Sequence, residues 1–335
     1  MLYFSKSIGL KPSFNRLAYC SLFFLALFFT SLHAQNWPSK PVKIVVTLSA
    51  GSTSDILARI IGDQLTKSLG QPFVVENRPG AGGNVAGEYT SHQAPDGYTI
   101  MLASISSHGI NPALYAKMPY DAIHDFTPII AIASSPNVLI ASNETPVSSV
   151  KDLITWIKSK PTDTINYSSA GNGTSMHLSG ELFNSMAGLK TLHVPFKGSP
   201  EAINSVMKNE VSFMFPNAPN AIPLAKGGKI KMLAVTSAKR LSWLPDLPTV
   251  AESGLPGFEV TAWFGFVGPL GIPTPIVNKL NSEVQKVLQL PSVNEALVDQ
   301  GFEPMGGSAT EFSQFMKSEI DKWSKVIKQS SIPKL

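Results

Sequence analysis

A strand–loop–helix order that is repeated near the start of the chain most constrains the fold. Residues 42–48, 73–76 and 98–103 are mostly apolar and rich in β-branched side chains, as buried strands are. Each is followed by a loop and then, for the first two, by a helix-like segment. Strands that alternate with helices favour a parallel sheet covered by helices on both faces. A second α/β unit occupies the middle of the chain, and the last sixty residues are mostly helical.

Two loops that open helices have a composition suited to binding an anion. Residues 168–174 follow a short strand, and residues 49–55 follow the strand 42–48; both loops contain glycine and several hydroxyl groups. The first N–H groups of a helix have no partner inside the helix, so a helix start attracts an anion. Taken alone, the loop 168–174 is better explained as an ordinary capped turn. Two such loops facing each other would form a two-sided cradle for a small anion.

Ligand contacts are therefore predicted on both loops, at the end of the third strand and at the start of a short helix after residue 216. The candidates are Ser52, Thr53, Ser54, Asp55, Ser106, Ser168, Ser169, Gly171, Asn172, Gly173, Thr174 and Asn217.

The N-terminal segment has the features of a secretory signal peptide. Lys6, Lys11 and Arg16 precede an almost wholly apolar run, and small residues near Ala34 would suit cleavage. The apolar run is short for a permanent membrane anchor. We therefore expect residues 1–34 to be removed on export to the periplasm. Removing three of the 27 basic residues leaves 24 against 23 acidic ones, a balance that does not favour a nucleic-acid partner.

Enzymatic, metal and cofactor sites find little support in the sequence. The only cysteine, Cys20, lies in the signal peptide, so we expect no thiol chemistry in the mature chain. The histidines, among them His108 and His177, show no metal-ligand spacing, and a hydrogen-bonded structural role is the better interpretation of both. No G-x-S-x-G nucleophile elbow occurs. The glycines at 80–87 fit neither nucleotide-binding motif and indicate a tight structural turn. We therefore predict no catalytic residues, no metal and no cofactor.

Five separate segments resemble the signatures of one family. They are residues 75–84 (VENRPGAGGN), 94–99 (APDGYT), 166–174 (NYSSAGNGT), 233–240 (LAVTSAKR) and 247–254 (LPTVAESG). In these the chain is similar to the Bug-type extracytoplasmic receptors of tripartite tricarboxylate transporters, and the resemblance extends from Trp37 to the last helix.

The resemblance implies a periplasmic binding protein whose two lobes close on a small carboxylate. It implies a membrane permease as partner, and it places the ligand between the loops matching 49–55 and 168–174. We expect a monomer. Two departures from the family pattern stand out: the first loop has hydroxyl groups where proline, glycine and an aromatic residue are common, and Pro216 replaces an acid that could meet a ligand's ammonium group.

We therefore predict an α/β, two-lobed periplasmic-binding-protein type II fold with a ligand cleft between the lobes. Lobe 1 is expected to be discontinuous, residues 36–133 plus 259–335, and lobe 2 to span 134–258. Two alternatives remain open at this point: a ligand-loaded sensor that docks on a signalling receptor, and a secreted hydrolase.

Overall fold

The computed structural model describes residues 1, 37–162, 164–330 and 332–335 of the chain. Residues 40–335 form one unit that contains two β-sheets. The predicted signal peptide lies, apart from Met1, outside the described residues. Among the helices that the structure describes, none is long and apolar enough to cross a membrane.

The larger sheet takes its strands from both the N-terminal and the C-terminal part of this unit. In spatial order these are β11 (Glu303–Gly306), β4 (Phe126–Pro136), β10 (Thr261–Pro269), β3 (Thr99–Ser104), β1 (Val42–Val46) and β2 (Phe73–Asn77). β1 is parallel to β2 and β3, which confirms the parallel pairing predicted for the first three strands. β10 runs antiparallel to β3 and β4, and β11 runs antiparallel to β4.

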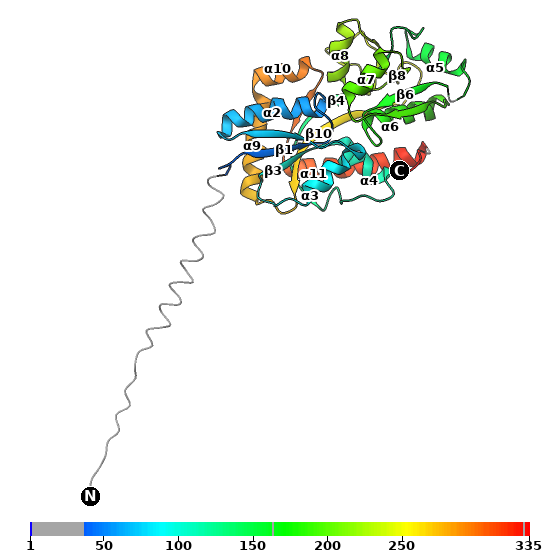
Figure 1. The fold of residues 1–335 in the computed structure, drawn as a ribbon. Coiled ribbons are helices and arrows are strands. Elements are labelled where there is room, and N and C mark those ends of the chain that lie inside the picture. The colour runs from blue at the N-terminus through cyan, green and yellow to red at the C-terminus, as the bar shows by residue number, and fades with distance from the viewer. Residues whose placement is uncertain (2–36, 163, 331) are drawn as a thin grey trace. The chain divides into compact units, whose positions relative to one another are not determined.

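The smaller sheet is built from the middle of the chain. In spatial order its strands are β7 (Leu192–Pro195), β6 (Asn166–Ser169), β8 (Phe213–Met214), β5 (Val138–Ala141) and β9 (Lys231–Val235). β6 is parallel to β7 and β8, whereas β5 is antiparallel to β8 and β9. In Figure 1 the green elements of this segment lie together at the upper right, to the right of the blue elements of the other sheet.

The chain changes from one sheet to the other twice. β4 ends at Pro136 in the larger sheet and β5 begins at Val138 in the smaller one, so a single residue, Asn137, separates them. The return lies between the end of β9 and Thr261 at the start of β10. We call the two halves lobe 1, on the larger sheet, and lobe 2, on the smaller one; their exact limits remain a prediction.

Helices cover both sheets. The longer ones are α2 (Thr53–Leu69), α3 (Asn84–Ser91), α5 (Val150–Lys158), α6 (Ser175–Ala187), α7 (Ser199–Met207), α8 (Ala218–Lys226), α9 (Thr274–Gln289), α10 (Pro291–Asp299) and α11 (Ala309–Gln329). Short helical turns are η1 (Ala81–Gly83), η2 (Ser106–Ile110) and α4 (Asn111–Leu114). In lobe 1, α9 and α11 pack against β4; in lobe 2, α6 and α7 pack against β6.

Local sequence explains where the helices begin and end. Thr174 caps α6, because its hydroxyl accepts the N–H of His177. At the other end of α6, Gly188 adopts the left-handed conformation that closes many helices, with φ of 62°. α11 begins with a reciprocal pair of bonds between Ser308 and Glu311, the capping box.

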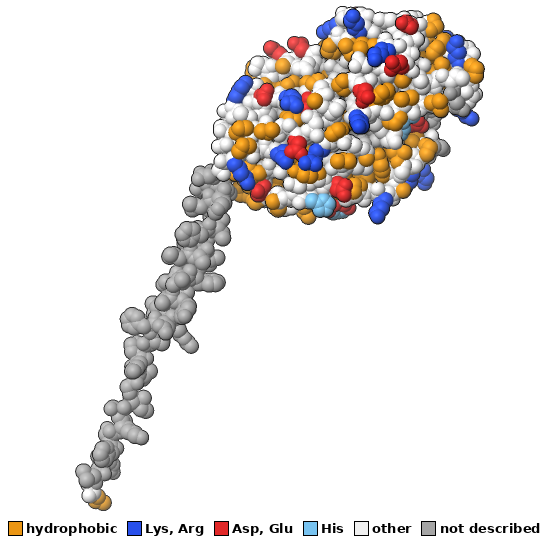
Figure 2. Space-filling view, in the orientation of Figure 1, with side chains coloured by type: hydrophobic (Ala, Val, Ile, Leu, Met, Phe, Trp, Pro, Cys, Tyr) orange, Lys and Arg blue, Asp and Glu red, His pale blue; other side chains and the backbone are white. Residues whose placement is uncertain are grey.

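Each lobe buries its own apolar core. In lobe 1 the core includes Val45 of β1 and Trp323 of α11, and in lobe 2 it includes Phe213 and Val206. On the face shown in Figure 2, basic and acidic side chains are interspersed. This distribution agrees with the near balance of charge predicted for the chain without residues 1–34.

Candidate functional site

A small pocket lies where the strands of lobe 1 meet the first turns of helices in lobe 2. Lobe 1 contributes residues at the ends of β1 and β3, one glycine of η1 and two residues of β10; lobe 2 contributes the start of α6 and the residue before α8. The lining residues are Thr47, Leu48, Gly82, Ser104, Ile105, Ser106, Thr174, Ser175, Met176, Asn217, Ala262 and Phe264. None of the twelve carries a charge, so an anion bound here would meet only neutral donors.

The start of α6 supplies N–H groups to this pocket. In the loop before it, the N–H of Gly173 is bound by His177 Nδ1 (3.3 Å) and that of Thr174 by the carbonyl of Gly171 (3.3 Å). The next two N–H groups, those of Ser175 and Met176, have no acceptor among the described residues. Both residues line the pocket, at the positive end of the helix dipole. This is the arrangement in which a helix start binds a carboxylate or phosphate.

Two histidines support this loop from behind. His193 Nε2 lies 2.6 Å from Ser169 Oγ, which in turn accepts the N–H of Gly171 (3.1 Å). The rings of His177 and His193 stack with centroids 4.2 Å apart. Burial lowers the pKa of His177 to about 4, and burial together with the charge of His177 lowers the pKa of His193 to about 3. Both rings are therefore neutral near pH 7, and a neutral His177 can accept the N–H of Gly173.

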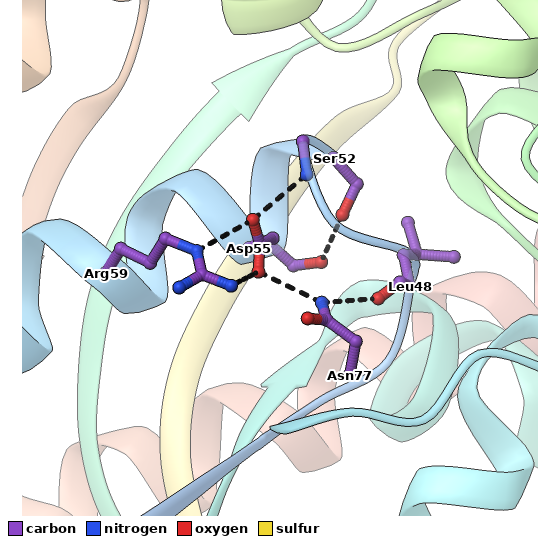
Figure 3. A network of polar contacts seen from close by, with 7 residues as sticks. Leu48, Ser52, Asp55, Arg59 and Asn77 are labelled. Carbon is purple, nitrogen blue, oxygen red and sulfur yellow. Dashed lines mark hydrogen bonds and ion pairs between the residues drawn. The ribbon is translucent and has the colours of Figure 1, made fainter. Parts of the chain in front are cut away.

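Asp55 of the first loop is held in a network of its own (Figure 3). Its carboxylate accepts the N–H of Gly51 (2.9 Å), the Arg59 guanidinium (2.9 and 3.0 Å) and the amide of Asn77 (3.0 Å). Burial opposes ionisation of Asp55, but these bonds outweigh it and hold its pKa below the ordinary value. Asn77 also donates to the carbonyl of Leu48 (2.9 Å), so the network fixes a residue that lines the pocket.

The first loop also contacts lobe 2 directly. Thr53 Oγ1 donates to Asn220 Oδ1 (2.7 Å), and Asn220 Nδ2 donates to the carbonyl of Gly51 (2.9 Å). Asn220 belongs to α8, so these two bonds join the lobes beside the pocket.

On the other side of the pocket, two glycines allow the loop before α6 in lobe 2 to lie close to η1 and α4 of lobe 1. A Cβ on Gly82 would lie 2.4 Å from the carbonyl oxygen of Asn172, and one on Gly173 would lie 2.2 Å from Asn111 Oδ1. Both glycines have positive φ, 61° and 79°. The loop of lobe 2 therefore packs on η1 and α4 of lobe 1 only because neither position carries a side chain.

Of the residues predicted from the sequence, Ser106, Thr174 and Asn217 line the pocket. The others lie behind it or beside it. Ser52 and Ser54 are buried, with their hydroxyls 3.3 Å apart, and Ser168 Oγ donates to the carbonyl of Ala202. Gly171, Asn172, Gly173 and Ser169 shape the loop that leads into α6, and Thr53 and Asp55 make the contacts described above. Direct ligand contacts by any of these residues remain a prediction.

Sequence reasoning did not select several residues of the lining. Gly82 belongs to the glycine-rich turn at 80–87, which the sequence indicates is structural and which, unlike the two predicted loops, contains no hydroxyl group. Ser175 and Met176 follow the capping residue Thr174, and they matter through their backbone N–H groups, which the pattern of hydroxyl groups and glycines does not indicate. Phe264 lies on β10, within the aromatic run 263–266, where it both belongs to the core and lines the pocket.

The remaining histidine of interest, His108, is a buried structural residue. It is fully buried, its Nδ1 lies 2.9 Å from Ser107 Oγ, and burial lowers its pKa to about 3. Among the described residues, no group of three or more His, Cys, Asp or Glu side chains could hold a metal ion.

Comparison with known proteins identifies the family. The model described as "Tripartite tricarboxylate transporter family receptor" (TctC) matches residues 57–332. Solved structures that are similar over most of the chain include the following three. Rpa4515 of R. palustris, solved with adipate, is 40% identical with a TM-score of 0.87, over 89% of this chain and 100% of that one. The periplasmic binding protein BugD is 33% identical with a TM-score of 0.86, over 89% and 100%. MatC (Rpa3494) from Rhodopseudomonas palustris, solved with malate, is 34% identical with a TM-score of 0.83, over 87% and 100%.

These relatives confirm the two-lobed α/β fold that was predicted from the sequence. The family and its structural neighbours are binding receptors, not enzymes, which excludes the hydrolase alternative. The chain belongs to the TctC family of extracytoplasmic solute-binding receptors, the group that includes the Bug proteins.

Proposed function

We propose that this protein is a periplasmic receptor that captures a small carboxylate between its lobes and delivers it to the permease of a tripartite tricarboxylate transporter. The observation that carries the proposal is the start of α6. Ser175 and Met176, whose N–H groups have no partner among the described residues, line a pocket with no charged lining residue. A carboxylate can accept hydrogen bonds from both N–H groups. No lysine or arginine then has to be buried beside it, so the cost of removing such a charge from water does not arise.

The lining also limits the kind of carboxylate. Leu48, Ile105, Met176, Ala262 and Phe264 give part of the pocket an apolar surface, which suits an aliphatic chain between polar ends. No acidic side chain lines the pocket, so an ammonium group would have no partner there. The adipate of one structural neighbour and the malate of another have this character. Aliphatic dicarboxylates are therefore the first ligands to test.

Binding requires that the lobes separate. The pocket has a volume of about 20 Å³, room for about one water molecule and too little for a dicarboxylate. The chain passes between the sheets at Asn137 and again between β9 and β10, and a rotation there would open the pocket. We propose boundaries close to the predicted 133/134 and 258/259: one at Asn137, because residues 134–136 still pair in the larger sheet, and one between β9 and β10. Closure on the ligand would then give the permease a surface that differs between the empty and the loaded receptor.

The test is a binding screen on the protein purified from the periplasm. Malate, succinate, adipate and citrate are compared in thermal melts with uncharged adipamide, followed by calorimetry. A ligand at 100 times its dissociation constant should stabilise the protein by about 2.7 kcal/mol. Stabilisation by at least one carboxylate and none by adipamide supports the proposal. If no carboxylate shifts the melt, the pocket at the start of α6 is not a carboxylate site.

Delivery to a permease is tested separately. Vesicles that contain the permease should accumulate the carboxylate only when the loaded receptor is added. Binding without stimulated uptake would favour the sensor, the alternative that the sequence left open.

A further inference from the structure

Asn137 is the single residue between β4 of lobe 1 and β5 of lobe 2. It is fully buried, and it lies between β4 and β5, which belong to different sheets. Any rotation of the lobes must therefore pass through its backbone or close to it. The pocket described above does not include Asn137.

The backbone of Asn137 is tied to the second connection between the lobes. Its N–H donates to Thr236 Oγ1 (2.8 Å), and its carbonyl accepts the N–H of Thr236 (2.9 Å). Thr236 follows β9, and its hydroxyl donates to the carbonyl of Val260, directly before β10. Through Thr236, the two connecting segments are joined into one hydrogen-bonded unit.

The side chain of Asn137 reaches two residues that line the pocket. Its Oδ1 accepts from Asn217 Nδ2 (2.7 Å) and, more weakly, from Ser175 Oγ (3.4 Å). Its Nδ2 donates to the carbonyl of Phe215 (2.8 Å). Ser175 is the first residue of α6, and Asn217 precedes α8. One buried amide thus contacts both helix starts that lobe 2 presents to the ligand.

This network also fixes how Asn217 is oriented. The carbonyl of Phe215 can only accept a hydrogen bond, so the Nδ2 group of Asn137 must face it and Oδ1 must face Asn217. The Nδ2 group of Asn217 must then face Asn137. What Asn217 offers to a ligand is therefore its Oδ1, an acceptor, which suits a ligand hydroxyl or a water bound to a carboxylate.

We propose that Asn137 is a positioning residue that couples the connection between the lobes to the ligand pocket, by holding Asn217 and the start of α6. The proposal rests on the carboxylate-binding function proposed above. Asn137 does not touch the ligand; its effect on affinity passes mainly through Asn217, because its bond to Asn217 (2.7 Å) is much shorter than its contact with Ser175 Oγ (3.4 Å). A change in the backbone at the connection would shift the Asn137 amide, and with it two groups that contact the ligand.

A double-mutant cycle between Asn137 and Asn217 tests this, with malate and adipate as probes in calorimetry. Asn137→Ala should raise the dissociation constant about tenfold, the equivalent of one to two hydrogen bonds. In an Asn217→Ala background, the same change should raise it less than about twofold, because the group through which it acts is already lost.

The matched control is Asn184→Ala. Asn184 is a buried asparagine farther along α6, and its Oδ1 accepts from Thr191 Oγ1 (2.9 Å) away from the pocket. This variant should melt at a lower temperature and keep the wild-type dissociation constant. A general loosening of lobe 2 would instead weaken binding in both variants.

Several results would overturn the proposal. One is an Asn137→Ala variant that folds and binds as wild type; another is a tenfold loss that persists in the Asn217→Ala background. If Asn137→Ala does not fold, a crystal structure of the wild-type complex decides: Asn217 must contact the ligand or its water while its Nδ2 stays bonded to Asn137. Failure of the wild type to bind any carboxylate would contradict the proposed function itself, and is seen before any variant is made.

Discussion

A methyl group added at Gly173 should block closure of the lobes while leaving lobe 2 folded. A Cβ at this position would lie 2.2 Å from Asn111 Oδ1 and 3.2 Å from the ring of Tyr115. Asn111 cannot easily move aside, because it is fully buried and its Nδ2 donates to Asn84 Oδ1 (2.7 Å) and to the carbonyl of Gly82 (3.2 Å). The overlap exists only when the loop before α6 rests on lobe 1.

Two free-energy costs determine how strongly Gly173→Ala should weaken ligand binding. Gly173 has φ of 79°, and a non-glycine residue in this conformation costs about 1–2 kcal/mol whether the lobes are open or closed. Relieving the overlap in the closed state costs at least one of the bonds of Asn111, about 1–3 kcal/mol. Only the second cost weakens binding, so Gly173→Ala should raise the dissociation constant about 5- to 150-fold.

Gly188→Ala is the matched control for backbone strain. Gly188 ends the same helix with φ of 62°, but no atom lies within 4 Å of a Cβ built there. This variant should lose stability in thermal melts and bind with unchanged affinity in calorimetry. If Gly173→Ala folds and binds as tightly as Gly188→Ala, the lobes do not close on this loop and the reasoning is wrong.

Three further outcomes are expected. Burial lowers the pKa of His108 to about 3 and of His177 to about 4, so the unfolded chain binds more protons below pH 6.5. The free energy of unfolding should therefore fall from pH 6.5 to 4.5 by at most about 1.4 kcal/mol per pH unit for each of these histidines, and His193, with its pKa lowered to about 3, adds to the fall; a flat urea-denaturation profile would contradict this. Asn220→Ala removes both bonds of that side chain between the lobes and should raise the dissociation constant about three- to tenfold, mainly through faster release seen by stopped flow; unchanged release would show that the contact does not stabilise closure. Ser308→Ala breaks the capping box of α11, which lies outside the pocket, and should cost about 1 kcal/mol of stability in urea denaturation at unchanged affinity; a weaker affinity would mean that α11 affects closure.

The elements that could be predicted from the sequence are those whose structure depends on a local pattern of residues. The apolar run at 42–48 predicted β1, and the glycines and hydroxyl groups before residue 175 predicted the start of α6, because strand pairing and helix capping depend on a few neighbouring residues. The short β11, in contrast, carries no alternating pattern, and it forms a strand because it pairs with β4, 170 residues away in the chain.

The residues of the pocket also differ in whether the local sequence indicates them. Thr174 could be selected from its own position before a helix, whereas Gly82 matters only because the loop 171–173 of the other lobe packs against it. Asn137 gave no signal in the sequence, since its role depends on Asn217 and Thr236, which meet it only in the folded chain. Contacts between distant segments cannot be read from composition or spacing.

A crystal structure of the complex with the carboxylate that gives the largest thermal shift tests the central claim most directly. The account predicts that a carboxylate oxygen lies about 2.7–3.2 Å from the backbone nitrogens of Ser175 and Met176, with no lysine or arginine in contact with it. The competing location is the hollow of about 250 Å³ that Lys158, Lys160 and Lys190 help to line in lobe 2. A ligand held there, with the start of α6 free, would contradict the claim that the helix start is the carboxylate site.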